Sequence, residues 1–198
     1  MGQLSAKNKV KMDKKILLHA CCAICAGYPI EKLLEEGYSP VVFFSNDNID
    51  TEDEFETRKN ALIKLCEHFN VKYIIDDYTP NLYLDKIKGL EDEPERGKRC
   101  DSCIYLRLEK SSQKAKELGI KEFTTTLVIS PHKDYDKITA IGKTFENTSL
   151  KYIGINFKKQ DGFLKTNRIS KELNLYRQNY CGCKFAKSHL KKGLQNGM

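Results

Sequence analysis

Short apolar runs alternate along this chain with longer segments whose apolar residues recur at helical spacing, and this alternation limits the possible folds more than any other feature. The runs are rich in branched and aromatic residues, which predicts buried strands at 15–20, 40–45, 71–75, 123–129 and 152–157. Strands separated by helices of this length form right-handed βαβ units. The sequence therefore predicts an α/β fold, with a mainly parallel sheet and helices on both faces.

Helix-start residues lie between these strands. Pro29 is favoured in the first turn of a helix, and the helix that it begins is expected to stop near Gly37. Thr51 is expected to cap a second helix, with Glu54 completing a capping box. The remaining helical segments are expected at 80–90, 100–118, 134–145 and through the C-terminal third, with an interruption at 181–183.

The length of 198 residues suits one domain with a core of its own. We expect a basic tail at 1–13 and a single α/β domain at 14–198 that ends in a helical segment. The formal charge of +7 is concentrated at the two ends, because residues 1–15 hold five lysines and one aspartate, and residues 184–198 hold four lysines and no acid. Basic ends can steer a polyanion such as nucleic acid, or only aid solubility.

The most apolar stretch, at 16–26, is too short to span a bilayer, so we expect no association with a membrane. It follows a basic segment, but His19 and three cysteines would lie inside the apolar region of a signal peptide, which argues against one. We therefore expect a cytoplasmic protein. Thiols are kept reduced there, so its eight cysteines favour metal ligands or redox groups over structural disulfides.

Seven of the eight cysteines fall into three groups, which are Cys21-Cys22-Ala-Ile-Cys25, Cys100-Asp-Ser-Cys103 and Cys181-Gly-Cys183. Adjacent cysteines suit a zinc ribbon poorly, whereas a larger centre lets neighbouring thiolates diverge. Two cysteines from the first group and two from the second could hold such a cluster. The eighth, Cys66, lies on the apolar stripe of a helix and is expected to be a buried hydrophobe.

The third cysteine group has a different chemistry. Cys181 and Cys183 can form a disulfide only in a small strained ring, for which Gly182 supplies the backbone freedom. Strained disulfides are easily reduced, which is typical of labile or catalytic pairs. The alternative is that the two thiols are further metal ligands.

Five blocks of the sequence, in this order, are similar to motifs of the QueH family of epoxyqueuosine reductases. They include His-Ala-Cys-Cys-Ala-Ile-Cys at 19–25 and Arg-Cys-Asp-Ser-Cys at 99–103, followed by blocks at 124–134, 157–159 and 175–183. The resemblance implies a Rossmann-like, HUP-related sheet. It also implies an oxidoreductase that removes the epoxide oxygen from epoxyqueuosine at the wobble position of tRNA, the last step of queuosine biosynthesis, with electrons from a donor that the sequence does not identify.

Carried over by position, the resemblance implies that a [4Fe-4S] cluster is bound by Cys21, Cys22, Cys100 and Cys103. It implies a redox-active pair at Cys181 and Cys183. It also leaves room for an additional mononuclear iron. Cys25 is a candidate ligand for that iron, with a spare thiol or a residue just outside the ligand set as the alternatives. The single α/β domain would then be a metal-cluster catalytic domain.

Other polar residues near these motifs are candidates for proton transfer and substrate binding. Asp134 and Tyr180 are candidate proton donors, although Asp134 could instead cap the following helix. The candidate substrate contacts are Asn46, Lys133, Lys158 and Arg177.

Two other functions compete with the reductase. An adenylating tRNA-modifying enzyme of the same fold class would need a Gly/Ser-rich pyrophosphate loop after the first strand, where this chain has cysteines. A zinc-stabilised RNA-binding module without catalysis would suit basic ends, but the adjacent Cys21 and Cys22 fit zinc poorly.

Overall fold

A five-stranded parallel sheet forms the centre of the computed structural model, which describes residues 14–186. The central strand β1 (Lys14–Ala20) pairs with β2 (Tyr38–Phe44) on one side and with β4 (Glu122–Thr125) on the other. At the two edges, β3 (Lys72–Ile75) pairs with β2, and β5 (Lys151–Tyr152) pairs with β4. The predicted mainly parallel sheet is confirmed.

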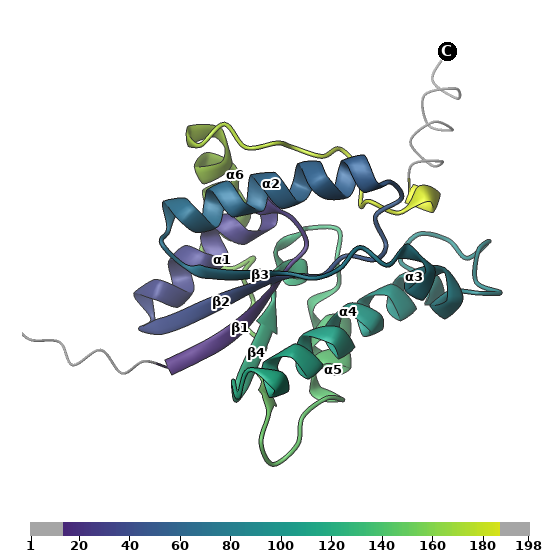
Figure 1. Cartoon of the computed structure of the whole chain (residues 1–198), viewed down its shortest axis with the longest axis horizontal. Coiled ribbons are helices and arrows are strands. Elements are labelled where there is room, and N and C mark those ends of the chain that lie inside the picture. Colours follow the sequence, from purple (N-terminus) through teal and green to yellow (C-terminus); the bar gives the residue numbers. More distant parts are fainter. Residues whose placement is uncertain (1–13, 187–198) are drawn as a thin grey trace, which may run out of the picture.

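Helices cover both faces of this sheet (Figure 1). One face carries α1 (Ala23–Glu35), α2 (Glu52–His68) and α6 (Gly162–Glu172), and α1 contacts both of the others. The other face carries α4 (Lys98–Glu117), preceded by α3 (Pro80–Lys86), and α5 (Tyr135–Lys143). The predicted Rossmann-like α/β class is therefore confirmed.

Burial on both faces explains the composition of β1. Residues from Ile16 to Ala20 are completely buried, including Leu17 and Leu18, whose side chains point to opposite faces. A parallel strand covered on both faces reads as a continuous apolar run, which is the signal seen in the sequence.

The order of the strands reverses at β1. The chain moves outward from β1 through β2 to β3, then crosses the sheet to enter β4 on the other side of β1. The carboxyl ends of β1 and β4 therefore lie side by side with their following segments diverging. Folds of this class form their ligand crevice at this switch point.

The helix after β1 begins earlier than predicted. It starts at Ala23, with Cys22 as its N-cap residue, so Pro29 lies inside the helix and not in its first turn. Proline removes a helical hydrogen bond, but Ala23 and Ala26 are buried in the core and offset that cost. The earlier start places all of the first cysteine group at the beginning of α1.

The second predicted cap forms only in part. Thr51 accepts a hydrogen bond from the backbone N–H of Glu54 at 3.3 Å, as expected. The carboxylate of Glu54 does not return to Thr51, because it binds Arg58 and Tyr176.

Two strands are shorter than predicted. β4 ends at Thr125, whose hydroxyl accepts the N–H of Leu127 and turns the chain into a 3₁₀ helix, η1 (Thr126–Ile129). β5 has only two residues. In the C-terminal third, α6 is the helix that the structure describes in full, and residues 173–183 are not helical.

The predicted basic tail at 1–13 and the chain from 187 onward lie outside the described residues, as do most of the C-terminal lysines. Within residues 14–186, no helix has the length and apolar composition needed to cross a membrane.

Leu18→Ala should lower the free energy of unfolding by about 2–5 kcal/mol, because it leaves a cavity in the fully buried centre of the sheet. Leu164→Ala removes the same atoms from a side chain that is 66% exposed, and it should change stability by less than about 0.5 kcal/mol. Urea unfolding of both variants under anaerobic, reducing conditions measures the difference. Equal destabilisation by the two substitutions would contradict this account of the core.

Candidate active site at the carboxyl end of the sheet

A cavity of about 630 Å³ lies at the switch point. Its wall contains cysteines from all three sequence groups, namely Cys21, Cys25, Cys100, Cys181 and Cys183. Segments that are distant in the sequence thus bring their thiols to one place. Of the predicted cluster ligands, Cys22 and Cys103 are buried beside this wall.

The first cysteine group is the most compact. The Sγ atoms of Cys21, Cys22 and Cys25 lie within 4.8 Å of one another, close enough for the three to hold a metal ion. Cys21 is also fixed from the neighbouring strand end, since its backbone N–H donates to Thr126 Oγ1 at 3.2 Å. These contacts depend on the helix starting directly after β1.

The three thiols of this group differ in acidity. Hydrogen bonds with Cys22 and Cys25 hold the pKa of Cys21 well below its usual range, and the charge of Arg107 acts in the same direction. The same contact with Cys21 raises the pKa of Cys22 to about 12, and that of Cys25 is also raised. Cys21 is therefore the thiolate of the group, and the thiolate is the form that binds metals.

The second cysteine group lies in the first turns of α4. The backbone N–H of Arg96 donates to Cys100 Sγ at 3.3 Å. Cys103 is buried in a cluster that includes Tyr83 and Cys183, and this burial raises the pKa of Cys103 to about 12.

The third cysteine group lies on the irregular segment after α6. Cys181 and Cys183 are both free thiols, and the ammonium of Lys133 lies 3.9 Å from Cys181 Sγ. The charge of Cys181 is the main reason that the pKa of Lys133 is raised. This lysine therefore stays protonated beside the pair.

Basic groups, several of them buried, line the same cavity as the thiols. The guanidinium of Arg107 donates to Asn46 Oδ1, while Asn46 Nδ2 donates to the carbonyl of Ala20 at 3.0 Å. Although burial alone would lower the pKa of Arg107, the neighbouring cysteines raise it. The cavity wall also contains the basic residues Arg58, Arg96, Arg99, Lys137 and Arg177.

The two candidate proton donors both line the cavity. Asp134 caps α5, with its carboxylate accepting the N–H groups of Asp136 at 2.9 Å and Lys137 at 3.1 Å. These bonds lower the pKa of Asp134 and keep it ionised. Tyr180 donates its hydroxyl proton to Asp50 at 2.6 Å, and burial, followed by this hydrogen bond, raises its pKa. Their catalytic roles stay predictions.

The candidate substrate contacts occupy different positions. Lys133 and Arg177 line the cavity, and Lys158 donates to the backbone carbonyl of Lys133. Asn46 is fully buried, and its side-chain amide donates to the carbonyl of Ala20 and accepts from Arg107. We therefore see Asn46 as support for Arg107, and its contact with substrate stays a prediction.

Two residues of the site are not evident from the sequence as functional groups. Arg107 lies on the buried face of α4 between Ile104 and Leu108, and a cation among apolar positions is the signal that marks it. Gln178 donates from Nε2 to Cys22 Sγ at 2.7 Å. No local pattern predicts this contact, because it joins the C-terminal segment to the start of α1.

Comparison with known proteins identifies the family. A family profile described as "Epoxyqueuosine reductase QueH" matches residues 16–189, nearly the whole chain. This chain belongs to the QueH family. The resemblance of the five sequence blocks is thereby confirmed, and the family relation makes the chain an enzyme of the oxidoreductase class, in place of the zinc-stabilised module.

Relatives of known name agree with this assignment. "Epoxyqueuosine reductase QueH" of Streptococcus pyogenes serotype M1 is 38% identical over 185 residues, covering 90% of this chain and 72% of that protein. The protein of the same name from Thermotoga maritima is 36% identical over 175 residues, covering 86% of this chain and 89% of that protein.

Solved structures share the fold of this QueH chain at low sequence identity. The U34-tRNA thiolase NcsA from Methanococcus maripaludis, solved with its [4Fe-4S] cluster, superposes with a TM-score of 0.54 at 17% identity. The match covers 92% of this chain but only 65% of NcsA. NMN synthetase from Francisella tularensis gives a TM-score of 0.51 at 10% identity, covering 86% of this chain and 68% of that one. Both support the HUP-related fold.

In the metal-free protein, iodoacetamide near pH 7 should label Cys21 well before Cys66. Cys21 is a partly exposed residue of the cavity wall whose pKa is lowered, whereas burial raises the pKa of Cys66 to about 12 and leaves it as a protonated thiol with no exposed surface. Mass spectrometry of peptides after timed labelling measures both rates. In urea the two rates should become equal, and faster labelling of Cys66 in the folded protein would contradict the assignment.

Proposed function

We propose that this cavity is where epoxyqueuosine, presented by a tRNA, loses its epoxide oxygen to give queuosine. The observation that carries the proposal is the convergence of three cysteine groups on one cavity in a chain of the QueH family. The relatives are named for this reaction. A base must leave the anticodon stack to reach such a cavity, as it does in other nucleobase-modifying enzymes.

The reaction needs two electrons and two protons. In the proposed step, both C–O bonds of the epoxide break, a C=C bond forms, and the oxygen leaves as water. Cys181 and Cys183 supply both electrons and both protons by forming one S–S bond. Their position in the cavity wall, with Lys133 beside Cys181, supports this role. A thiol or protein reductant must then reduce the disulfide again.

The donor set of the first two cysteine groups fits an iron–sulfur cluster. Cys21 is held as a thiolate beside Cys22, and Cys100 shares the same cavity wall. The buried cation Arg107 offsets part of the negative charge of such a centre. With the family resemblance and the [4Fe-4S] cluster of NcsA, this supports Cys21, Cys22, Cys100 and Cys103 as ligands.

Such a cluster, when bound, supplies one-electron transfer and exposed iron that acts as a Lewis acid. The compact first group leaves Cys25 beside two of the cluster ligands, so Cys25 is the candidate for holding an additional mononuclear iron. This assignment rests on the proximity of the three thiols.

The other side chains of the cavity would bind the tRNA and transfer protons during the reaction. Tyr180 keeps its proton because its pKa is raised, which suits a relay that gives a proton to the leaving oxygen and regains one from the dithiol, whereas the ionised Asp134 suits a proton acceptor. Lys133 and Arg177 would contact the polar edge of the base or the phosphates of the tRNA, with Lys158 holding Lys133 in place.

We place this enzyme in the cytoplasm, as a single domain over 14–198 preceded by the basic tail at 1–13.

Anaerobic turnover of tRNA that contains epoxyqueuosine tests the function directly. The wild-type protein with a chemical reductant should produce queuosine, detected by nucleoside mass spectrometry. Cys183→Ser should retain iron and tRNA binding but lose turnover at least about 100-fold, because one thiol cannot close the disulfide. Cys66→Ala, which removes a core cysteine, should stay active. A fully active Cys183→Ser enzyme would remove the pair from the mechanism.

Cys100→Ala tests the cluster ligands. After anaerobic reconstitution the wild-type protein should be brown, and Cys100→Ala should lose most of the visible absorbance together with iron and sulfide. Cys66→Ala controls for the loss of any cysteine and should reconstitute normally. Unchanged iron and sulfide in Cys100→Ala would refute its assignment as a ligand.

A further inference from the structure

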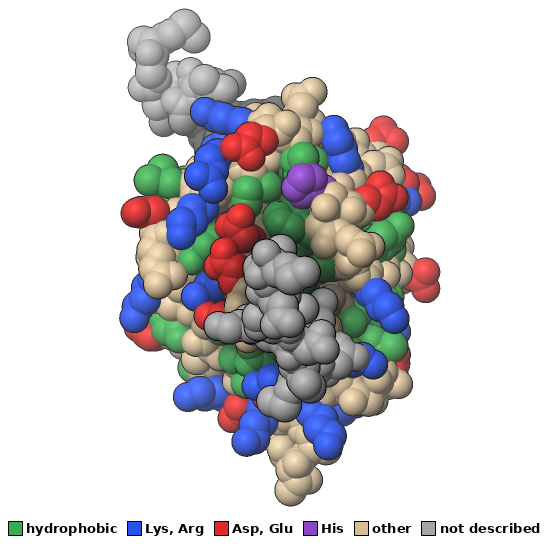
Figure 2. Space-filling view, turned by 90° about the vertical axis from the view of Figure 1, so that its left-hand side faces the viewer, with side chains coloured by type: hydrophobic (Ala, Val, Ile, Leu, Met, Phe, Trp, Pro, Cys, Tyr) green, Lys and Arg blue, Asp and Glu red, His purple; other side chains and the backbone are tan. Residues whose placement is uncertain are grey.

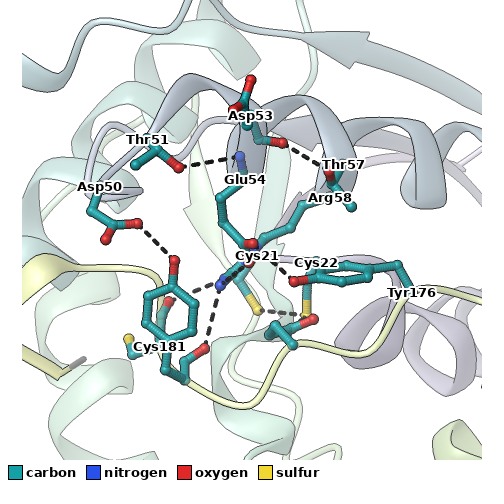
Figure 3. A network of polar contacts seen from close by, with 12 residues as sticks. Cys21, Cys22, Asp50, Thr51, Asp53, Glu54, Thr57, Arg58, Tyr176 and Cys181 are labelled. Carbon is teal, nitrogen blue, oxygen red and sulfur yellow. Dashed lines mark hydrogen bonds and ion pairs between the residues drawn. The ribbon is translucent and has the colours of Figure 1, made fainter. Parts of the chain in front are cut away.

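The segment at 175–183, which carries the third cysteine group, lies across the N-terminal end of α2 (Figure 3). Two tyrosines attach it there. Tyr176 donates to Glu54 at 2.8 Å, and Tyr180 donates to Asp50 at 2.6 Å. Figure 3 shows Arg58 between these two contacts, pointing from α2 toward the backbone beside Cys181.

Arg58 is a buried cation with only 2% of its surface exposed. Its Nε donates to Glu54 at 2.7 Å, which fixes the plane of the guanidinium. Its two terminal nitrogens donate to the carbonyls of Cys181 at 3.2 Å and Tyr180 at 3.4 Å. One side chain therefore holds two successive peptide groups at the start of the Cys-Gly-Cys sequence.

The next peptide group is also held. The carbonyl of Gly182 accepts the backbone N–H of Asp50 at 2.9 Å. Gly182 has a φ of +114°, and a Cβ added there would lie 3.1 Å from Arg58 Nη1 and 3.3 Å from Asn48 Nδ2. Three successive carbonyls are thus fixed while both thiols are free, with side chains packed closely around the glycine between them.

We propose that Arg58 is a positioning residue for the Cys181–Cys183 pair, holding its backbone in the open dithiol form. This inference rests on the proposed redox function of the pair. Closing a disulfide across a single glycine forms a small ring, which restricts the peptide groups on both sides of Gly182. A rotation of either peptide group would break its hydrogen bond to Arg58 or Asp50.

The hydrogen bonds therefore favour the dithiol over the disulfide. A disulfide that forms against them is strained and readily reduced again, which allows the pair to be regenerated after each turnover. Arg58 acts through the backbone and contacts no Sγ atom among the described hydrogen bonds, so its effect should be seen in the redox equilibrium of the pair.

The test uses the reconstituted protein in anaerobic glutathione buffers of defined ratio. Oxidised glutathione converts the dithiol to the disulfide and leaves as two reduced glutathione molecules. After acid quenching and alkylation, mass spectrometry measures the fraction of Cys181–Cys183 disulfide. Arg58→Gln should shift the equilibrium toward the disulfide at least about tenfold, the size expected for losing hydrogen bonds from a charged donor.

Arg58→Lys keeps the charge, but a single ammonium cannot span Glu54 and two carbonyls. This variant should therefore also shift the equilibrium toward the disulfide. This milder variant also carries the test if Arg58→Gln does not fold. Lys59→Gln is the matched control, because Lys59 is an ion-paired cation on the same helix that pairs with Glu56. It should keep the wild-type equilibrium.

A wild-type equilibrium constant in Arg58→Gln or in Arg58→Lys would overturn the positioning role, as would a shift toward the dithiol. A wild-type pair that forms no disulfide even in the most oxidising buffer would instead overturn the redox function itself. The two failures are thus distinguishable in one series of measurements.

Discussion

The parallel pairing of β1 with strands on both of its sides is the interaction on which the rest of the site depends. Because β2 and β4 flank β1, the segments that follow β1 and β4 leave in different directions, and a crevice opens between them. Cys21 follows one strand end and Thr126 follows the other, where they are joined by a hydrogen bond. The sheet topology therefore sets where the cysteines can meet (Figure 1).

Bringing several thiols together at the switch point has an electrostatic cost, which nearby cations reduce. A thiolate in a low-dielectric site is unfavourable unless an opposite charge is close. Arg107 provides that charge from α4 and Lys133 from the loop before α5, and Asn46 anchors Arg107 to the end of β1. On the face of the molecule where the strands begin, Lys and Arg side chains are interspersed with acidic ones (Figure 2). In the cavity, by contrast, Lys133 lies beside Cys181, and the neighbouring cysteines raise the pKa of Arg107.

Much of the sheet and the three cysteine groups could be predicted, because each depends on a local signal. An apolar run marks a strand covered on both faces, and the groups at Cys21 and Cys100 follow a strand end or begin a helix. The predicted start of α1 is wrong, because Pro29 favours a helix start there whereas the helix begins at Ala23, with Ala23 and Ala26 buried in the core. The contacts of Gln178 and Arg58 cannot be predicted from the sequence, since they join segments that only the tertiary fold brings together.

The cysteine groups of the site differ in how they are supported, and this difference suits their proposed chemistry. Cys21 and Cys100 stand at the beginnings of helices that pack on the sheet, so metal ligands there would keep their positions. Cys181 and Cys183 lie on an irregular segment that hydrogen bonds attach to α2 and to the loop before it. A pair that forms and breaks a covalent bond must rearrange its backbone, and an irregular segment allows this more readily than a helix packed on the sheet does.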